Sequence, residues 1–162
     1  MSVPTLEEAR KGIVKYAEWA VAHHERFGYN DERPFPLEHF DRWAPTTSKL
    51  YIDCSGFATL LSFWGGGGDP NGYHWNGYGN GESMAKHLQW IPQQSTQPGD
   101  FICYAPYHVT IIMEAGTSSN ISTQKVVSMG HTGDPGFYQN GQFLREFPNA
   151  AVIYMRLKRR EA

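Results

Sequence analysis

The stretch YIDCSGFATLLSFWGGGG, residues 51–68, predicts a buried helix that begins at a cysteine. Asp53 is a good N-cap residue, so Cys54 is expected at the first helical position. An apolar stripe at helical spacing must pack inwards, and it consists of Phe57, Leu60, Leu61 and Trp64. This helix is the element around which the rest of the fold is expected to be arranged.

The start of a helix is a favourable place for a reactive thiol. Unpaired N–H groups and the positive end of the helix dipole stabilise a thiolate there. Ser55 and Gly56 are small and leave the sulfur of Cys54 approachable. Cys54 is therefore a candidate nucleophile, and the alternative is a small buried hydrophobe, as most free cysteines are. Cys103 is the second of two cysteines, and both are expected as free thiols, with Cys103 buried in a strand.

The segments before and after this helix are of different kinds. A helix is expected over residues 5–27, with a capping box of Thr5 and Glu8 and a stop at Gly28. Residues 29–50 read as an irregular segment that wraps the domain. Residues 65–83 are rich in glycine, asparagine and aromatic residues and predict a long surface loop.

The second half of the chain changes to a strand pattern after a short helix expected over residues 83–91. β-Branched and aromatic residues dominate four runs, which are FICYA (101–105), HVTIIME (108–114), KVVSMG (125–130) and AVIYMRLK (151–158). Helices followed by adjacent strands indicate an α+β fold with an antiparallel sheet. We see no repeat or boundary, so residues 1–162 are expected to form one domain.

Composition excludes several classes of function. The chain has 162 residues, of which 40% are hydrophobic and 19% charged, which is typical of a globular protein. A net charge of −2 gives no electrostatic case for nucleic acid or an anionic membrane. The N-terminus MSVPTLEEARKG has no apolar signal region, and no apolar run is long enough to span a membrane.

A thiol nucleophile needs a base that lies near it in space. The run PGDFICYAPYHVTIIMEAG, residues 98–116, provides His108 at the start of a strand. A single histidine at a strand end is more often structural, but its pairing with a helix-start cysteine is typical of a papain-like layout. The seven histidines include no HExxH or Cys-pair motif, so no metal or cofactor is expected.

Three motifs in order, DCSGF, QPGDFICY and HVTIIMEAG, resemble the NlpC-type cysteine peptidases of bacterial cell walls (the NlpC and p-sixty superfamily). The resemblance runs from about residue 13 to residue 157. It implies a papain-like domain in which N-terminal helices, including the nucleophile helix, pack on a central antiparallel sheet. The loop at residues 65–83 resembles one found in the phage-encoded branch, among endolysins and tail-associated peptidases.

By this resemblance Cys54 is the nucleophile and His108 the base, held together as a thiolate–imidazolium pair. The family's third residue is polar and orients the base. Related phage-type domains read Ser-His-Gly where this chain has Ser128-Met129-Gly130-His131, and Met129 cannot hold an imidazole by hydrogen bonding. We favour His131 as the orienting residue, with Ser128 or none as alternatives.

Other residues are candidates for the substrate side of the site. By the resemblance, Tyr51 lines it, with a core or rim tyrosine as the alternative, and backbone N–H groups at Cys54 and Ser55 stabilise the oxyanion. Four loop aromatics either wall a groove or pack the loop itself, namely Trp43, Tyr73, Trp75 and Tyr78.

The expected function is hydrolysis of an amide bond in the peptidoglycan stem peptide, commonly between D-glutamate and diaminopimelate or lysine. The protein would be a phage-encoded lysin or tail-associated enzyme, made in the cytoplasm without a signal peptide, acting at the bacterial cell wall and monomeric. The alternatives are a non-catalytic structural or wall-binding module on the same fold, and a cysteine acyltransferase that shares the mechanism.

Overall fold

A six-stranded antiparallel sheet organises the molecule. In the computed structural model, residues 3–37, 40, 49–131 and 133–158 are described. The strand order is β3-β8-β4-β5-β6-β7. The bounds of the strands are β3 Gln89–Trp90, β4 Phe101–Ala105, β5 His108–Ile112, β6 Lys125–Ser128, β7 Gly136–Gln139 and β8 Ala151–Arg156. The α+β class with an antiparallel sheet is confirmed, although β3 and β7 were not expected.

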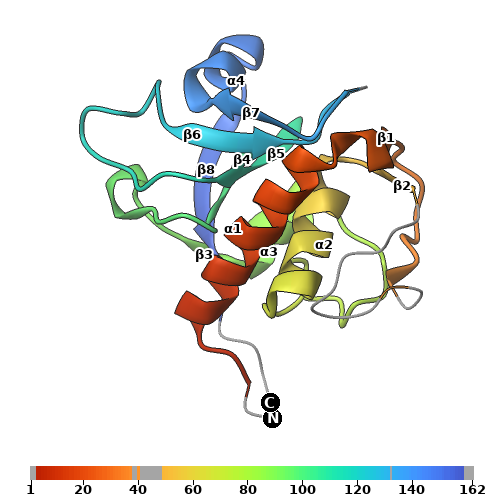
Figure 1. The fold of residues 1–162 in the computed structure, drawn as a ribbon. Helices are drawn as coiled ribbons and strands as arrows, with labels where there is room; N and C mark the ends of the chain where they lie inside the picture. Colours follow the sequence, from red (N-terminus) through yellow and green to blue (C-terminus); the bar gives the residue numbers. More distant parts are fainter. Residues whose placement is uncertain (1–2, 38–39, 41–48, 132, 159–162) are drawn as a thin grey trace.

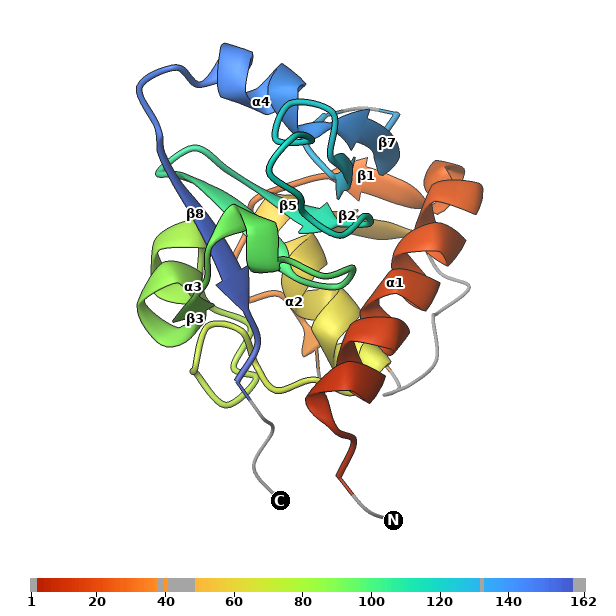
Figure 2. The same cartoon turned by 90° about the vertical axis from the view of Figure 1, so that its left-hand side faces the viewer.

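Helices cover both faces of this sheet (Figures 1 and 2). On one face lie α1 Leu6–Ala22, α2 Cys54–Gly65 and α3 Gly81–His87, and on the other lies α4 Asn140–Glu146. The two faces have separate apolar clusters: one includes Val109 and Ile111 of β5, and the other includes Ile112 of β5 with Phe143 of α4. Strand β5 is therefore buried on both sides, because its alternating side chains face two different layers.

Helix α2 is as buried as its sequence predicts. Phe57, Leu60, Leu61 and Trp64 are completely buried. Close packing against α1 depends on a pair of glycines, since a Cβ at Gly12 would lie 2.2 Å from the carbonyl oxygen of Gly65. Larger side chains at this crossing would push the two helices apart.

The first helix is shorter than expected. Its capping box of Thr5 and Glu8 is confirmed, but α1 ends at Ala22 rather than at residue 27. A short 3-10 turn leads into β1 Phe27–Tyr29, which pairs in parallel with β2 Leu50–Ile52. The stop expected at Gly28 is thus wrong, because pairing between strands overrides the local helical pattern.

Of residues 29–50, which were expected to be irregular, Tyr29 belongs to β1 and Leu50 to β2, whereas residues 30–36 are irregular as expected. Residues 38–39 and 41–48 lie outside the described residues. The helix expected over residues 83–91 is also displaced: α3 begins earlier, capped by Asn80, and residues 89–90 belong to β3 instead.

Among the described residues, no helix is long and apolar enough to cross a membrane.

Candidate active site

The nucleophile candidate sits where the sequence puts it. Cys54 is the first residue of α2, and the Asp53 side chain caps the helix by accepting a hydrogen bond from the Gly56 N–H at 2.9 Å. The Asp53 carbonyl accepts the first helical bond from Phe57 at 2.8 Å. Both capping bonds lie within residues 53–57, and they confirm the predicted helix start.

The thiol of Cys54 lies against strand β5. The backbone N–H groups of Val109, Ser55 and Cys54 itself lie near the sulfur and lower the pKa of the thiol. These three donors favour the thiolate, but burial and the adjacent Asp53 carboxylate outweigh them and raise the pKa of Cys54 to about 11. The resting side chain is therefore the neutral thiol at physiological pH.

The base candidate stands directly before the residue that contacts the thiol. His108 is the first residue of β5, is 8% exposed, and has its Nε2 atom 2.7 Å from Oγ of Ser128 on β6. Its ring stacks on Phe143 of α4 with the centroids 5.0 Å apart, and Tyr104 and Phe147 pack beside it. The imidazole is fixed by neighbours from β4, β6 and the helix α4 with its C-cap residue Phe147.

Burial also decides the charge of this imidazole. It lowers the pKa of His108 to about 4, and the nearby Asp134 carboxylate opposes the shift only in part. The pair of Cys54 and His108 is therefore neutral at rest, and the thiolate–imidazolium pair expected from the resemblance is not what the electrostatics favour. Within the described part of the chain, no hydrogen bond joins the thiol to the imidazole.

The residue that holds His108 is Ser128 rather than His131. His131 has a 69% exposed side chain, and its Nδ1 atom lies 3.7 Å from Oδ2 of Asp134. Residue 129, where related domains have histidine, is a methionine buried in the cluster beneath α2. Strand alternation puts residues 128 and 129 on opposite faces, so only Ser128 shares a face with His108. The hydrogen bond to the imidazole thus comes from Ser128, the alternative named from the sequence, and the role of His131 as the orienting residue stays a prediction.

Asp134 was not expected from the sequence, yet it shapes this side of the site. The carboxylate is buried and accepts hydrogen bonds from the backbone N–H of Gly130 at 2.9 Å and of His131 at 3.2 Å, and from the hydroxyl of Tyr138. A Cβ at Gly130 would lie 3.1 Å from Cε1 of His108. Asp134 thus fixes the turn that packs against the imidazole.

A cavity of about 120 Å³ opens beside His108. The residues that line it come from β1, β5, β6, β7, α4 and the connections between them, and they include Tyr29, His108, Ser128, His131 and Tyr138. Tyr29 was missed in the sequence, and no motif marks it. Burial raises the pKa of Tyr29, and the Cys54 side chain adds to this rise, so its phenol lies near both halves of the site.

Two of the expected substrate residues have other contacts. The Tyr51 ring packs on Gly28, where a Cβ would lie 2.6 Å from the ring atoms. The Nζ atom of Lys49 lies over the same ring, 5.6 Å from its centroid. The Ser55 hydroxyl is buried and accepts a hydrogen bond from Arg33 at 3.2 Å. Of the polar groups of Ser55, the backbone N–H faces the thiol. This N–H is one of the groups expected to stabilise an oxyanion.

The glycine-rich loop is ordered largely by its own residues. Asp69 accepts backbone N–H bonds from Asn71, Tyr73 and Trp75. Trp75 packs edge-on against Phe63 of α2, whereas Tyr73 and Tyr78 are exposed. Trp43 lies outside the described residues.

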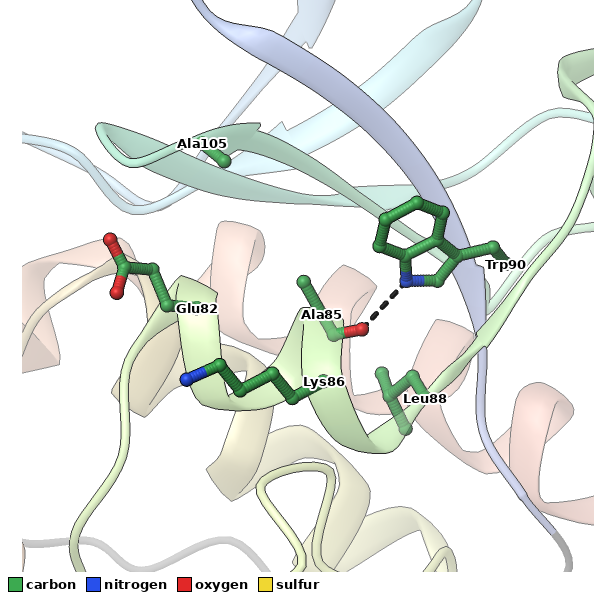
Figure 3. Close-up of a pocket in the computed structure, with 6 residues that line it drawn as sticks. All are labelled: Glu82, Ala85, Lys86, Leu88, Trp90 and Ala105. Carbon is green, nitrogen blue, oxygen red and sulfur yellow. Dashed lines mark hydrogen bonds between the residues drawn. The ribbon is translucent and has the colours of Figure 1, made fainter.

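A second, wider hollow of about 530 Å³ lies between α3 and the end of β4 (Figure 3). Glu82 and Lys86 project from α3, and the exposed indole of Trp90 forms the opposite wall and donates a hydrogen bond to the Ala85 carbonyl at 2.6 Å. The buried Cys103 donates a hydrogen bond to the Gly81 carbonyl at the start of α3, at 3.5 Å. The surface of the hollow is mostly apolar.

Both cysteines are free thiols, as expected. Among the described residues, no group of three or more histidine, cysteine, aspartate or glutamate side chains is arranged to hold a metal ion. No protein-family model matches the chain, and no curated protein or solved structure matches it either. A functional assignment therefore depends on the chemistry of the site and on the motifs that the sequence carries.

Proposed function

We propose that this protein is a cysteine peptidase or amidase that hydrolyses an amide bond in the stem peptide of peptidoglycan. One observation carries the proposal: the thiol of a helix-start cysteine lies against the backbone N–H of the residue that follows His108. The candidate nucleophile therefore lies beside the strand whose first residue is the candidate base, although the two come from distant parts of the chain. The resemblance of the motifs to the NlpC-type enzymes supports the same pairing.

The proposed reaction begins from the neutral pair. With its proton on Nε2, His108 donates to Oγ of Ser128 and keeps the lone pair of Nδ1 for the Cys54 thiol. Nδ1 takes the thiol proton as the sulfur attacks the amide carbonyl, and the N–H groups of Cys54 and Ser55 stabilise the oxyanion. The imidazolium then protonates the leaving amine, and water, deprotonated by His108, cleaves the thioester.

This mechanism requires the imidazole to approach the thiol when substrate binds. Catalytic hydrogen bonds are often long or absent in a free enzyme and form only in the complex. Asp134 assists at that stage, since its carboxylate raises the pKa of His108 and so favours the imidazolium that forms. If bound substrate excludes water from the site, the attraction between the Asp134 carboxylate and the imidazolium becomes stronger.

The substrate is taken from the resemblance to the NlpC-type family. On that basis we propose the bond between D-glutamate and diaminopimelate or lysine, and a phage-encoded lysin or tail-associated protein that acts at the bacterial cell wall. A net charge of −2 is compatible with a stem peptide that carries charges of both signs. An acyltransferase would use the same residues and differ only in the acceptor.

The neutral, unconnected Cys54 and His108 favour a second candidate. A structural or wall-binding module on the same fold would keep the helix start without needing an activated thiol. The raised pKa of Cys54 and the lowered pKa of His108 both support this candidate. It predicts binding to the cell wall without release of any fragment.

The experiment is muropeptide release from purified diaminopimelate-type peptidoglycan, measured by mass spectrometry, with and without hydroxylamine. The wild type is compared with Cys54→Ala and His108→Ala, and Cys103→Ala is the matched control because that thiol is fully buried. New amine ends that disappear in the first two variants and persist in the third support the peptidase. Hydroxamate products indicate acyl transfer. A folded wild type that binds the wall and releases nothing supports the non-catalytic module.

A further inference from the structure

Several hydrogen bonds connect Arg33 to the start of α2, and none of them has a role in the proposed reaction. Its Nη2 donates to Oδ1 of Asp53 at 2.8 Å and to the Ser55 hydroxyl at 3.2 Å. Its Nε donates to the Gly79 carbonyl at 3.2 Å, just before α3. One guanidinium thus connects the residues on either side of Cys54 to a loop that is distant in sequence.

The same guanidinium is fixed at its base. Nη1 donates to the carbonyls of Asp31 and Glu32 at 3.4 and 3.1 Å. The Arg33 and Asp53 side chains are only 18% and 14% exposed, so solvent screens their ion pair less than it would a surface pair. The planar fork of arginine matches several acceptors at once, which a lysine ammonium cannot do from one position.

The charge of Arg33 matters because of where Asp53 lies. The Asp53 carboxylate adjoins Cys54 and is the second largest cause, after burial, of the raised pKa of the thiol. A guanidinium 2.8 Å from that carboxylate offsets its negative charge. Among the described residues, the titratable or charged groups near the thiol are Asp53 at the helix cap, Arg33 paired with it, Tyr29 on β1 and Cys103 on β4, and His108 begins the adjacent strand β5.

We propose that Arg33 is a positioning residue of the Cys54 site, which holds the first turn of α2 in place and neutralises the Asp53 carboxylate beside the thiol. The role in catalysis rests on the proposed function. The effect on the thiol does not, because the reactivity of Cys54 can be measured without any peptidoglycan.

The test is the rate of alkylation of Cys54 by iodoacetamide between pH 7 and 10, located by peptide mass spectrometry. Arg33→Gln leaves Asp53 unpaired, and we expect alkylation at a given pH to slow roughly tenfold. Lys11→Gln is the control, since it removes the same charge at an exposed site on α1. It should alkylate at the wild-type rate.

A double variant separates charge from structure. Asn at position 53 keeps an acceptor for the Gly56 N–H and removes the carboxylate charge. Arg33→Gln combined with Asp53→Asn should therefore return the alkylation rate to near the wild-type value. An Arg33→Gln rate equal to wild type overturns the proposal, and so does a slowed rate that the double variant fails to restore.

Two further variants keep the test decisive. If Arg33→Gln does not fold, Asp53→Asn alone is informative, because an unopposed Arg33 should make alkylation faster than in the wild type, and an unchanged or slower rate overturns the proposal. Arg33→Lys keeps the charge and loses the fork, so it should lower kcat on peptidoglycan with little change in KM. If peptidoglycan is not cleaved at all, the alkylation results still decide whether Arg33 controls the thiol.

Discussion

The two halves of the candidate site are built in different ways. The thiol half is local: Asp53, Cys54 and Gly56 are nearly consecutive, and one capping bond sets their geometry. The imidazole half is assembled from residues far apart in the chain, with Tyr104, His108, Ser128 and Phe143 contributed by three strands and α4. A candidate nucleophile can therefore be located from a short motif, whereas the environment of the candidate base depends on tertiary packing.

The largest loss of stability is expected when the packing around the His108 imidazole is removed. Phe143→Ala removes the ring stacked on His108, and truncating a buried phenylalanine costs about 3–5 kcal/mol of unfolding free energy. The measurement is urea denaturation followed by circular dichroism. Phe137→Ala is the control, because this ring on β7 is 44% exposed and should change stability by less than about 0.5 kcal/mol. Equal losses would mean that α4 does not support the imidazole.

The burial of the His108 imidazole should also make the stability of the protein depend on pH. The pKa of His108 is lowered from 6.5 to about 4, so the unfolded chain gains a proton before the folded protein does. Stability is therefore complete above pH 6.5 and falls as the pH drops towards 4, by about 3 kcal/mol. Denaturation curves at pH 7 and pH 4.5 test this. His108→Gln cannot titrate and should lose less stability over the same interval; an identical loss would contradict a neutral, buried imidazole.

A smaller effect distinguishes the two candidates for the residue that orients the base. Ser128→Ala removes the hydrogen bond to Nε2 of His108, and we expect kcat to fall about fivefold, since one neutral hydrogen bond contributes about 1 kcal/mol. His131→Ala should leave kcat within about twofold, because an exposed side chain is removed. The assay is the initial rate of muropeptide release. The reverse order of effects would restore His131 as the orienting residue.

The smallest effect belongs to the local half. Asp53→Ala removes the helix cap, which costs about 1 kcal/mol. Asp53→Asn keeps an acceptor and should stay within about 0.5 kcal/mol of the wild type in the same thermal or chemical denaturation. If both variants lose the same stability, the ion pair with Arg33 and not the cap supports this turn.

Local sequence patterns determined much of the fold. The capping box at Thr5, the buried stripe of α2 and the runs that became β4, β5, β6 and β8 follow from periodicity and side-chain type, and the structure has them all. Errors arose where a partner strand decided the outcome. The helix expected to reach residue 27 gives way to β1 because β2, which lies more than twenty residues later, pairs with it.

For the site, the sequence by itself determined where Cys54 stands, because an N-cap acts within one turn of helix. It also nominated His108 and, as an alternative, Ser128. Only the tertiary structure decided that Ser128 holds the imidazole, that Arg33 reaches the cap and that Tyr29 and Asp134 border the site. It also made the resting pair neutral, since the burial that shifts both pKa values is created by layers of side chains brought together from the whole chain.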